Sequence, residues 1–166
     1  KTIFKDAELA FVGGYWASKG VQIDRYLKQV ENKLTVYGYN KWPYANFGGQ
    51  ISYDDEPSLY ASAKICPVIN EPTVGLMHGQ INERVFKVLG SGGMPIVDNI
   101  PQYRQLFSED ELIISSDPDD FLEKVNFFLS NPDARKKYIQ SGRQAVFNRH
   151  TYLHRAKFFL KNLNID

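Results

Sequence analysis

Short apolar runs alternate with segments of helical periodicity in the first part of the chain. Leu9 to Val12 form an apolar run closed by two glycines, which is the pattern of a buried strand that runs into a tight turn. Segment 21–30 places apolar residues at roughly helical intervals, and 34–40 is a second run of β-branched and aromatic residues. We therefore expect a strand, a helix and a strand in succession. Segment 40–57, rich in Gly, Pro, Asn and aromatic residues, has no sustained period and predicts a structured loop.

The same alternation continues through the middle of the chain. Pro57 starts a helical segment that ends near residue 63, and 81–89 and 101–107 also have helical patterns. Pro67 lies inside the strand that follows the first of these helices, and it either weakens this strand prediction or places the strand near an edge of the sheet. The three predicted strands lie within 65–69, 91–98 and 111–115.

The last third of the chain is expected to be helical. Asp117 before Pro118 and Asn131 before Pro132 each combine an N-cap with a proline in the first turn, which marks two separate helix starts. The first helix and the terminal segment each have an apolar stripe that needs a surface to cover. The stripes are Phe121, Leu122, Val125, Phe128 and Leu129, and Tyr152, Ala156, Phe159, Leu160 and Leu163.

Strands separated by helices in this repeated order predict an α/β fold with a parallel sheet and helices on both faces. Residues 1–166 contain no internal repeat and no flexible linker, so we expect a single domain. Ligands of such sheets bind beyond the carboxyl ends of the strands. Segments 13–16, 38–40, 70–72 and the turn before 81–86 are therefore expected to gather at one edge.

The composition is that of a globular chain. Its 166 residues are 43% hydrophobic and 14% aromatic with a net charge of +1, which excludes a disordered tail and argues against an electrostatic nucleic-acid binder. No apolar run approaches the roughly 20 residues of a membrane span, and the first residues lack the order of a signal peptide. The single Cys66 and three scattered histidines give no metal-ligand spacing, and a reducing, cytoplasmic location is expected.

Two turns could hold an anionic ligand. Gly13 and Gly14 follow the first strand and allow close backbone approach, and Lys19 can reach an anionic group; the alternative is a tight turn with a solvated lysine. The spacing is neither the GxGxxG fingerprint nor a GxxxxGK[ST] phosphate loop, which disfavours a dehydrogenase or a P-loop enzyme. Before 84–89, free helix amides and Arg84 could bind phosphate. The alternative is that Glu83 complements the helix dipole while Arg84 points to water.

Other chemical groups give weaker indications. His78, in a glycine-containing loop, could transfer a proton or be a surface or capping group. The aromatic residues of 37–47 could stack on a base or a sugar, or pack the loop. Segment 131–166 has eight basic residues against two acidic ones, which suits an anionic partner or the solvated face of two helices. No nucleophile is tied to a histidine by the sequence, so no catalytic residue is assigned.

The helix–glycine–strand unit around Ser91 to Val97 and the terminal sequence HTYLHRA resemble a known family. From residue 9 to the end, the chain is similar to the C-terminal half of GT-B glycosyltransferases of group 1, in particular the branch related to spore maturation. The resemblance implies a Rossmann-like domain that binds a nucleotide-sugar donor such as a UDP- or GDP-sugar. It implies phosphate contacts from Gly13, Gly14, Lys19, Asn82 and Arg84, and contacts to sugar or nucleoside from Tyr15, Tyr39, His78, Glu83 and Lys87.

The chain departs from the family pattern in two ways. Many relatives have a glutamate, expected to hold the ribose, where this chain has Lys87; Glu83, one turn earlier, could substitute. GT-B enzymes also have two Rossmann-like halves, and only one is present here. The resemblance therefore implies an N-terminal acceptor domain in a longer chain, which would supply acceptor recognition.

Three functions are compatible with these residues. The leading one is donor binding for glycosyl transfer to a glycan, lipid or protein acceptor. It requires no metal, because fixed cations and amides can stabilise the leaving diphosphate, and Asp54 and Asp55 lie in a loop rather than at a strand end. The alternatives are a non-catalytic module that binds a nucleotide, a glycan or another protein, and one half of a sugar-nucleotide epimerase.

Overall fold

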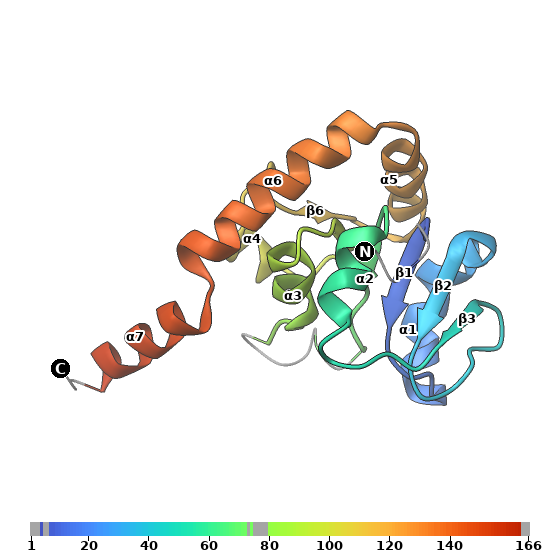
Figure 1. Ribbon diagram of the computed structural model, residues 1–166, viewed down its shortest axis with the longest axis horizontal. Helices are drawn as coiled ribbons and strands as arrows, with labels where there is room; N and C mark the ends of the chain where they lie inside the picture. Colours follow the sequence, from blue (N-terminus) through green and yellow to red (C-terminus); the bar gives the residue numbers. More distant parts are fainter. Residues whose placement is uncertain (1–3, 5–6, 73, 75–79, 164–166) are drawn as a thin grey trace.

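The computed structural model describes residues 4, 7–72, 74 and 80–163, and only the backbone of residues 17–19. Strands and helices alternate along the chain before three helices end it (Figure 1). The strands are β1 (Leu9–Val12), β2 (Leu34–Tyr37), β3 (Asn46–Gly49), β4 (Cys66–Val68), β5 (Pro95–Val97) and β6 (Ile113–Ile114). The helices are α1 (Ala17–Leu27), the 3-10 helix η1 (Lys28–Lys33), α2 (Glu56–Ser62), α3 (Arg84–Gly90), α4 (Tyr103–Leu106), α5 (Pro118–Ser130), α6 (Pro132–Arg149) and α7 (Tyr152–Asn162).

All six strands are parallel. They form two ladders, β1-β2-β3 and β4-β5-β6. A bridge between Leu9 and Ile65 joins the ladders, with Ala10 N donating to Ile65 O at 3.0 Å and Ile65 N donating to Glu8 O at 3.0 Å. The strand order is therefore 3-2-1-4-5-6, that of doubly wound nucleotide-binding folds, and it reverses between β1 and β4. The predicted α/β class is confirmed.

Pro67 interrupts the ladder in the middle of the sheet. The expectation that its strand lies near an edge is wrong, because β4 has β5 on one side and β1 on the other. Cys66 N donates to Met94 O at 2.8 Å, toward β5, whereas Ile65 N donates toward β1. Amides alternate in direction along a strand, so residue 67 faces β1 at the one position where proline has no N–H. The pairing of β1 with β4 is consequently limited to a single bridge.

A third strand lies within the segment expected to be a loop. β3 pairs with β2 through Thr35 to Asn46 and Val36 to Phe47. A side chain at Gly48 would collide with the ring of Tyr37, so the glycine allows this close pairing. The expectation of a loop over all of 40–57 was wrong because a glycine-rich strand shows no hydrophobic alternation.

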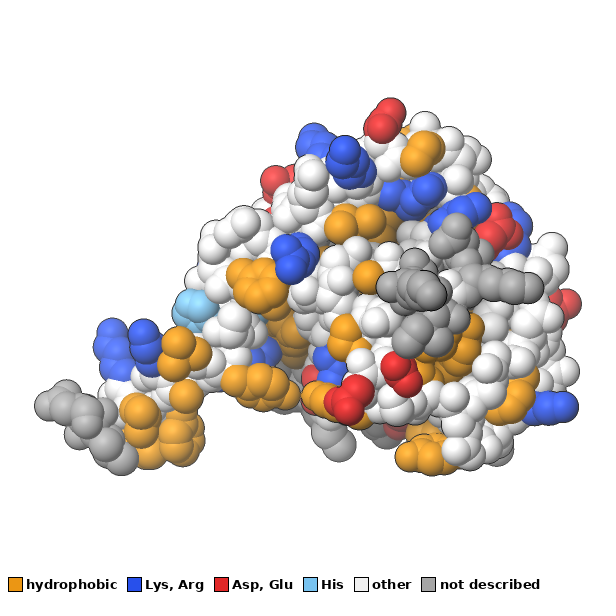
Figure 2. Space-filling model, viewed as in Figure 1, with side chains coloured by type: hydrophobic (Ala, Val, Ile, Leu, Met, Phe, Trp, Pro, Cys, Tyr) orange, Lys and Arg blue, Asp and Glu red, His pale blue; other side chains and the backbone are white. Residues whose placement is uncertain are grey.

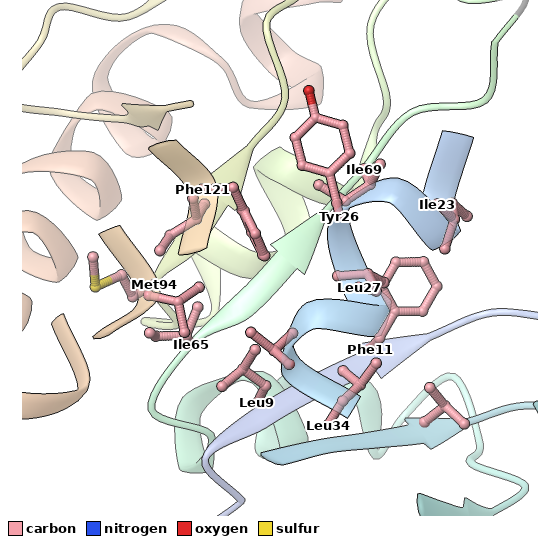
Figure 3. Packing of buried hydrophobic residues seen from close by; sticks show 14 of the residues in the cluster. Leu9, Phe11, Ile23, Tyr26, Leu27, Leu34, Ile65, Ile69, Met94 and Phe121 are labelled. Carbon is pink, nitrogen blue, oxygen red and sulfur yellow. The ribbon is translucent and has the colours of Figure 1, made fainter. Parts of the chain in front are cut away.

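Helices cover both faces of the sheet. On one face, Phe11 of β1 packs with α1 and α5 through residues such as Leu27 and Phe121 (Figure 3). On the other, Ala10 packs with α2 and α3 through residues such as Leu59 and Val88. Full burial of a large apolar side chain contributes roughly 1.5–3 kcal/mol, so these two clusters hold the layers together.

The C-terminal helices differ in how much they bury. Asp117 caps α5 as predicted, accepting hydrogen bonds from Asp119 N at 2.9 Å and Asp120 N at 3.0 Å, and the stripe of α5 is buried against the core. α7 has no buried residue and extends away from the rest of the chain (Figure 1). Figure 2 shows hydrophobic side chains gathered along this protruding arm. Tyr152 is 80% exposed and Phe159 is 63% exposed. The stripe predicted for α7 therefore covers nothing among the described residues.

Candidate functional site

The segment that follows β1 is fixed by hydrogen bonds to neighbouring loops. Gly13 N donates to Tyr37 O at 2.8 Å, and Trp42 Nε1 donates to Gly13 O at 3.0 Å. Tyr15 N donates to Asn40 Oδ1 at 3.2 Å, while Asn40 Nδ2 donates to Tyr15 O at 2.9 Å. The carboxyl ends of β1 and β2 therefore form one rigid surface, which confirms that segments 13–16 and 38–40 meet.

Close approach of the two strand ends requires glycine at residue 38. Gly38 has a φ of +155°, and a Cβ there would lie 2.9 Å from Gly13 O. A Cβ at Gly14 would lie 3.3 Å from both Asn40 Oδ1 and the Trp16 ring, so any side chain would crowd this surface. Gly13 and Gly14 present no side chain at this surface, and their contact with a ligand stays a prediction.

α1 begins beside this surface without a side-chain cap. Its N-cap residue, Trp16, makes no capping hydrogen bond. The first backbone N–H groups of an uncapped helix lack intrahelical partners and carry partial positive charge. Lys19 lies in this first turn; its side chain is outside the described part of the chain.

Arg84 reaches the same strand end from a distant part of the sequence. It is the first residue of α3, and Arg84 N donates to Asn82 Oδ1 at 3.0 Å. Its guanidinium carbon lies 4.7 Å from the centroid of the Phe11 ring, and Phe11 is two residues before Gly13. Arg84 makes no ion pair with a carboxylate of the described residues. Within the described part of the chain, a cation without a carboxylate partner therefore lies at the end of β1.

Glu83 and Lys87 lie on another side of α3. Lys87 Nζ is 3.0 Å from Glu83 Oε1, 3.9 Å from Glu56 Oε2 and 4.9 Å from the centroid of the Tyr53 ring. Burial lowers the pKa of Lys87, but the hydrogen bond to Glu83 and the charge of Glu56 outweigh burial and raise it. Lys87 is therefore a paired cation, unlike Arg84.

A cavity of 460 Å³ opens beside Lys87, between α3, the loop after β3 and the junction of α6 with α7. Arg155 stacks on Phe86 with its guanidinium carbon 4.6 Å from the ring centroid, and His150 Nε2 lies 3.0 Å from Leu106 O. Burial lowers the pKa of His150, so its ring is biased toward the neutral form. His150 and Arg155 both line this cavity. They belong to the terminal sequence HTYLHRA, which indicates the family but did not predict a cavity.

The other predicted site residues are Tyr15, Tyr39 and His78. Tyr15 lies in an aromatic cluster, with its ring centroid 5.4 Å from that of Trp42 and its hydroxyl donating to Asp24 Oδ2 at 3.0 Å. The packing alternative for the aromatic residues of 37–47 therefore applies to Trp42, on which Tyr15 packs. Tyr39, at the carboxyl end of β2, is 90% exposed. His78 lies outside the described residues.

The described residues contain no cluster of three or more His, Cys, Asp or Glu that could hold a metal ion. Cys66 is buried, and burial raises the pKa of its thiol to about 12, so it is an unreactive core residue. Among the same residues, no helix combines the length and apolar character needed to cross a membrane.

Comparisons with known proteins give one family model and several structures of similar fold. A family model described as "Glycosyl transferase-like" matches residues 22–161. T4 phage BGT in complex with its UDP-glucose substrate aligns over 89% of this chain and 46% of its own, with a TM-score of 0.73 and 14% identity. Sucrose-phosphate synthase from Thermosynechococcus elongatus aligns over 96% of this chain and 46% of its own, with a TM-score of 0.69 and 14% identity.

A glycosyltransferase from Rickettsia africae aligns over 96% of this chain and 48% of its own, with a TM-score of 0.67 and 12% identity. The chain therefore spans less than half the length of these three structures, and at these identities the likeness concerns the fold. T4 phage BGT has also been solved in complex with UDP and Mn²⁺. A search of curated protein sequences gives no match.

Proposed function

Because the chain belongs to the glycosyl transferase-like family, we propose that residues 1–166 form the donor-binding domain of a glycosyltransferase. The ligand is the nucleoside diphosphate of an activated sugar. It binds at the carboxyl ends of β1 and β4, where the strand order reverses. The observation that supports this most directly is the guanidinium of Arg84, which lies over the Phe11 ring, two residues before Gly13, and has no ion pair among the described residues.

The diphosphate is held by fixed positive groups. The uncapped first turn of α1 supplies backbone N–H groups, and Arg84 can donate two parallel hydrogen bonds to phosphate oxygens. Asn82 contributes by holding Arg84 N, and Lys19 adds a second cation. As the bond between the sugar and the diphosphate breaks, negative charge develops on the leaving phosphate, and these groups stabilise it without reorganising. The transfer then requires no metal from this domain.

The nucleoside and sugar are assigned to the flanks of this phosphate site. Tyr39 offers an exposed ring for stacking on the base. Glu83 and Lys87 border the cavity on the other side of α3 and are assigned to the ribose or the sugar, with His78 as a further candidate. Tyr15 contributes the surface of its ring to the site, since its hydroxyl is hydrogen-bonded to Asp24.

The acceptor is bound by a second domain, which we assign to the N-terminal part of a longer chain. Two observations support this. The chain spans less than half of the glycosyltransferase-fold structures it resembles. The apolar side chains of α7, among them Leu153, Phe158 and Phe159, are exposed by more than half. A glycan, lipid or protein acceptor and a cytoplasmic location complete the proposal; the buried, reduced Cys66 is compatible with that location.

Calorimetric titration of this chain with UDP, GDP, ADP and dTDP tests the donor site. We expect one nucleotide to bind and Arg84→Ala to weaken it about 10- to 100-fold, the loss of a charge-assisted pair of hydrogen bonds. Lys19→Ala is expected to weaken it as well. Arg143→Ala is the matched control, because Arg143 also lies over a phenyl ring, 4.8 Å from the centroid of Phe147, but on α6. Equal affinities of the Arg84 and Arg143 variants would refute the site.

One observation favours a non-catalytic binding module as the second candidate. Lys87 is paired with Glu83 and Glu56 rather than free to receive a ribose, at a position where the family resemblance implies a glutamate in many relatives. In that case the longer chain would bind the nucleotide but release no free UDP or GDP from its sugar nucleotide in the presence of candidate acceptors. A coupled assay for the released nucleoside diphosphate separates the two functions.

A further inference from the structure

A buried carboxylate and a buried amide meet at the carboxyl ends of β4 and β5. Asp98 follows β5 and is 2% exposed, and Asn70 lies two residues after β4 and is 1% exposed. Asn70 N donates to Asp98 Oδ2 at 3.1 Å, and Asn70 Nδ2 donates to Asp98 Oδ1 at 2.5 Å. The side chain of Gln22, from α1, also hydrogen-bonds Asp98.

The hydrogen bonds continue from this pair to the turn before α3. Asn70 Nδ2 donates to the hydroxyl of Tyr103, which is 0% exposed, at 3.1 Å. Burial raises the pKa of that hydroxyl, and the backbone of Asn82, which faces it, opposes part of this shift. Asn82 Oδ1 accepts from Arg84 N, so a continuous chain of polar groups runs from the interior of the sheet to the residue above β1.

This arrangement is costly for stability. Burial raises the pKa of Asp98, although the hydrogen bonds from Asn70 and Gln22 oppose that shift. Asn70 Oδ1 is buried with no hydrogen-bond partner among the described residues. Buried polar groups of this kind are often less stabilising than apolar residues of similar volume, but they fix geometry.

We propose that Asp98 and Asn70 are positioning residues that set the place of Arg84 through Tyr103 and Asn82. This inference rests on the proposed function, in which Arg84 binds the diphosphate. Asp98 holds both the backbone and the side chain of Asn70, so the amide is aimed at Tyr103 in one orientation. Tyr103 then fixes the turn at Asn82, and the turn fixes the backbone position from which the Arg84 side chain extends. Asp98, Asn70 and Tyr103 act through Arg84 rather than on the nucleotide.

Tyr103→Phe tests the link, because it removes one hydroxyl and leaves the pair of Asp98 and Asn70 intact. The matched control is Ser115→Ala, which also removes a fully buried hydroxyl at this sheet edge, one that donates to Val97 O at 2.7 Å and leads away from Arg84. We expect Tyr103→Phe to weaken nucleotide binding about fivefold or more and to speed amide hydrogen exchange at residues 82–86. Ser115→Ala is expected to change neither. Indistinguishable exchange in the two variants would overturn the proposal.

A swapped pair separates positioning from general stability. Asp98→Asn places an amide opposite the amide of Asn70 and should weaken binding and speed exchange at 82–86. The double variant Asn70→Asp, Asp98→Asn exchanges donor and acceptor, and the Tyr103 hydroxyl can then donate to the carboxylate at residue 70. Recovery of exchange protection in the double variant supports positioning, and a double variant no better than Asp98→Asn contradicts it. If the wild type binds no nucleotide, the proposed function fails, while exchange without nucleotide still decides whether this chain of groups holds the turn.

Discussion

Gly142→Ala is expected to destabilise the protein although it replaces glycine inside a helix. In an exposed helix this change stabilises by roughly 0.5–1 kcal/mol, since glycine loses more backbone entropy on folding. Gly142 instead lies where α6 packs on α3, and a Cβ there would lie 2.5 Å from both Glu111 O and Leu89 Cδ2. Glu111 O is a backbone atom and cannot rotate away. Overpacking of this kind costs roughly 1–3 kcal/mol, which leaves a net loss of about 1–2 kcal/mol.

Thermal unfolding followed by circular dichroism measures this loss. A net change of that size corresponds to a fall in melting temperature of roughly 2–8 °C for a chain of this length. Gly90→Ala is the control, because its Cβ would meet only Val146 Cγ1, at 3.7 Å, an ordinary contact. A Gly142→Ala protein that melts at or above the wild-type temperature would show that α3 and α6 are less tightly packed than described. The packing that supports α3, and with it Arg84, would then be weaker as well.

Two further predictions concern the surroundings of the site. Trp42→Phe removes the hydrogen bond to Gly13 O, worth about 0.5–1.5 kcal/mol, and is expected to lower the melting temperature and weaken nucleotide binding; unchanged affinity would show that the Gly13 segment needs no such support. Burial lowers the pKa of His150 below its usual 6.5, so the unfolded chain takes up the proton first and stability is lost as the pH falls through 6.5. His150→Phe should flatten this dependence in melting curves between pH 5 and 8, and an unaltered slope would assign it to other groups.

The sequence predicts the parts of the fold that depend on local pattern. Strands β1 and β2 and the capped start of α5 follow from apolar periodicity and from Asp117, and family membership follows from the helix–glycine–strand unit at 91–97. β3 could not be predicted, because its pairing depends on the ring of Tyr37 lying over Gly48 rather than on its own composition.

The candidate site also has residues that the local sequence predicts and contacts that depend on tertiary structure. Gly13, Gly14 and Arg84 were candidates from local sequence. Lys87 pairs with Glu56 of another helix, whereas Arg84 has no carboxylate partner among the residues that the structure describes, and neither outcome follows from local sequence. The polar pair of Asn70 and Asp98 joins residues 28 positions apart and has no sequence motif. Long-range polar contacts of this kind depend on tertiary structure alone.

The proline in β4 also has a mechanical consequence. Because Pro67 offers no N–H to β1, the two three-stranded ladders meet at a seam held by backbone bonds between residues 7–10 and 64–65. Gly13 follows the ladder on one side of this seam, and Arg84 follows a strand of the ladder on the other. A diphosphate held by both would link the two ladders, so that ligand binding adds a connection where the sheet has few backbone hydrogen bonds of its own.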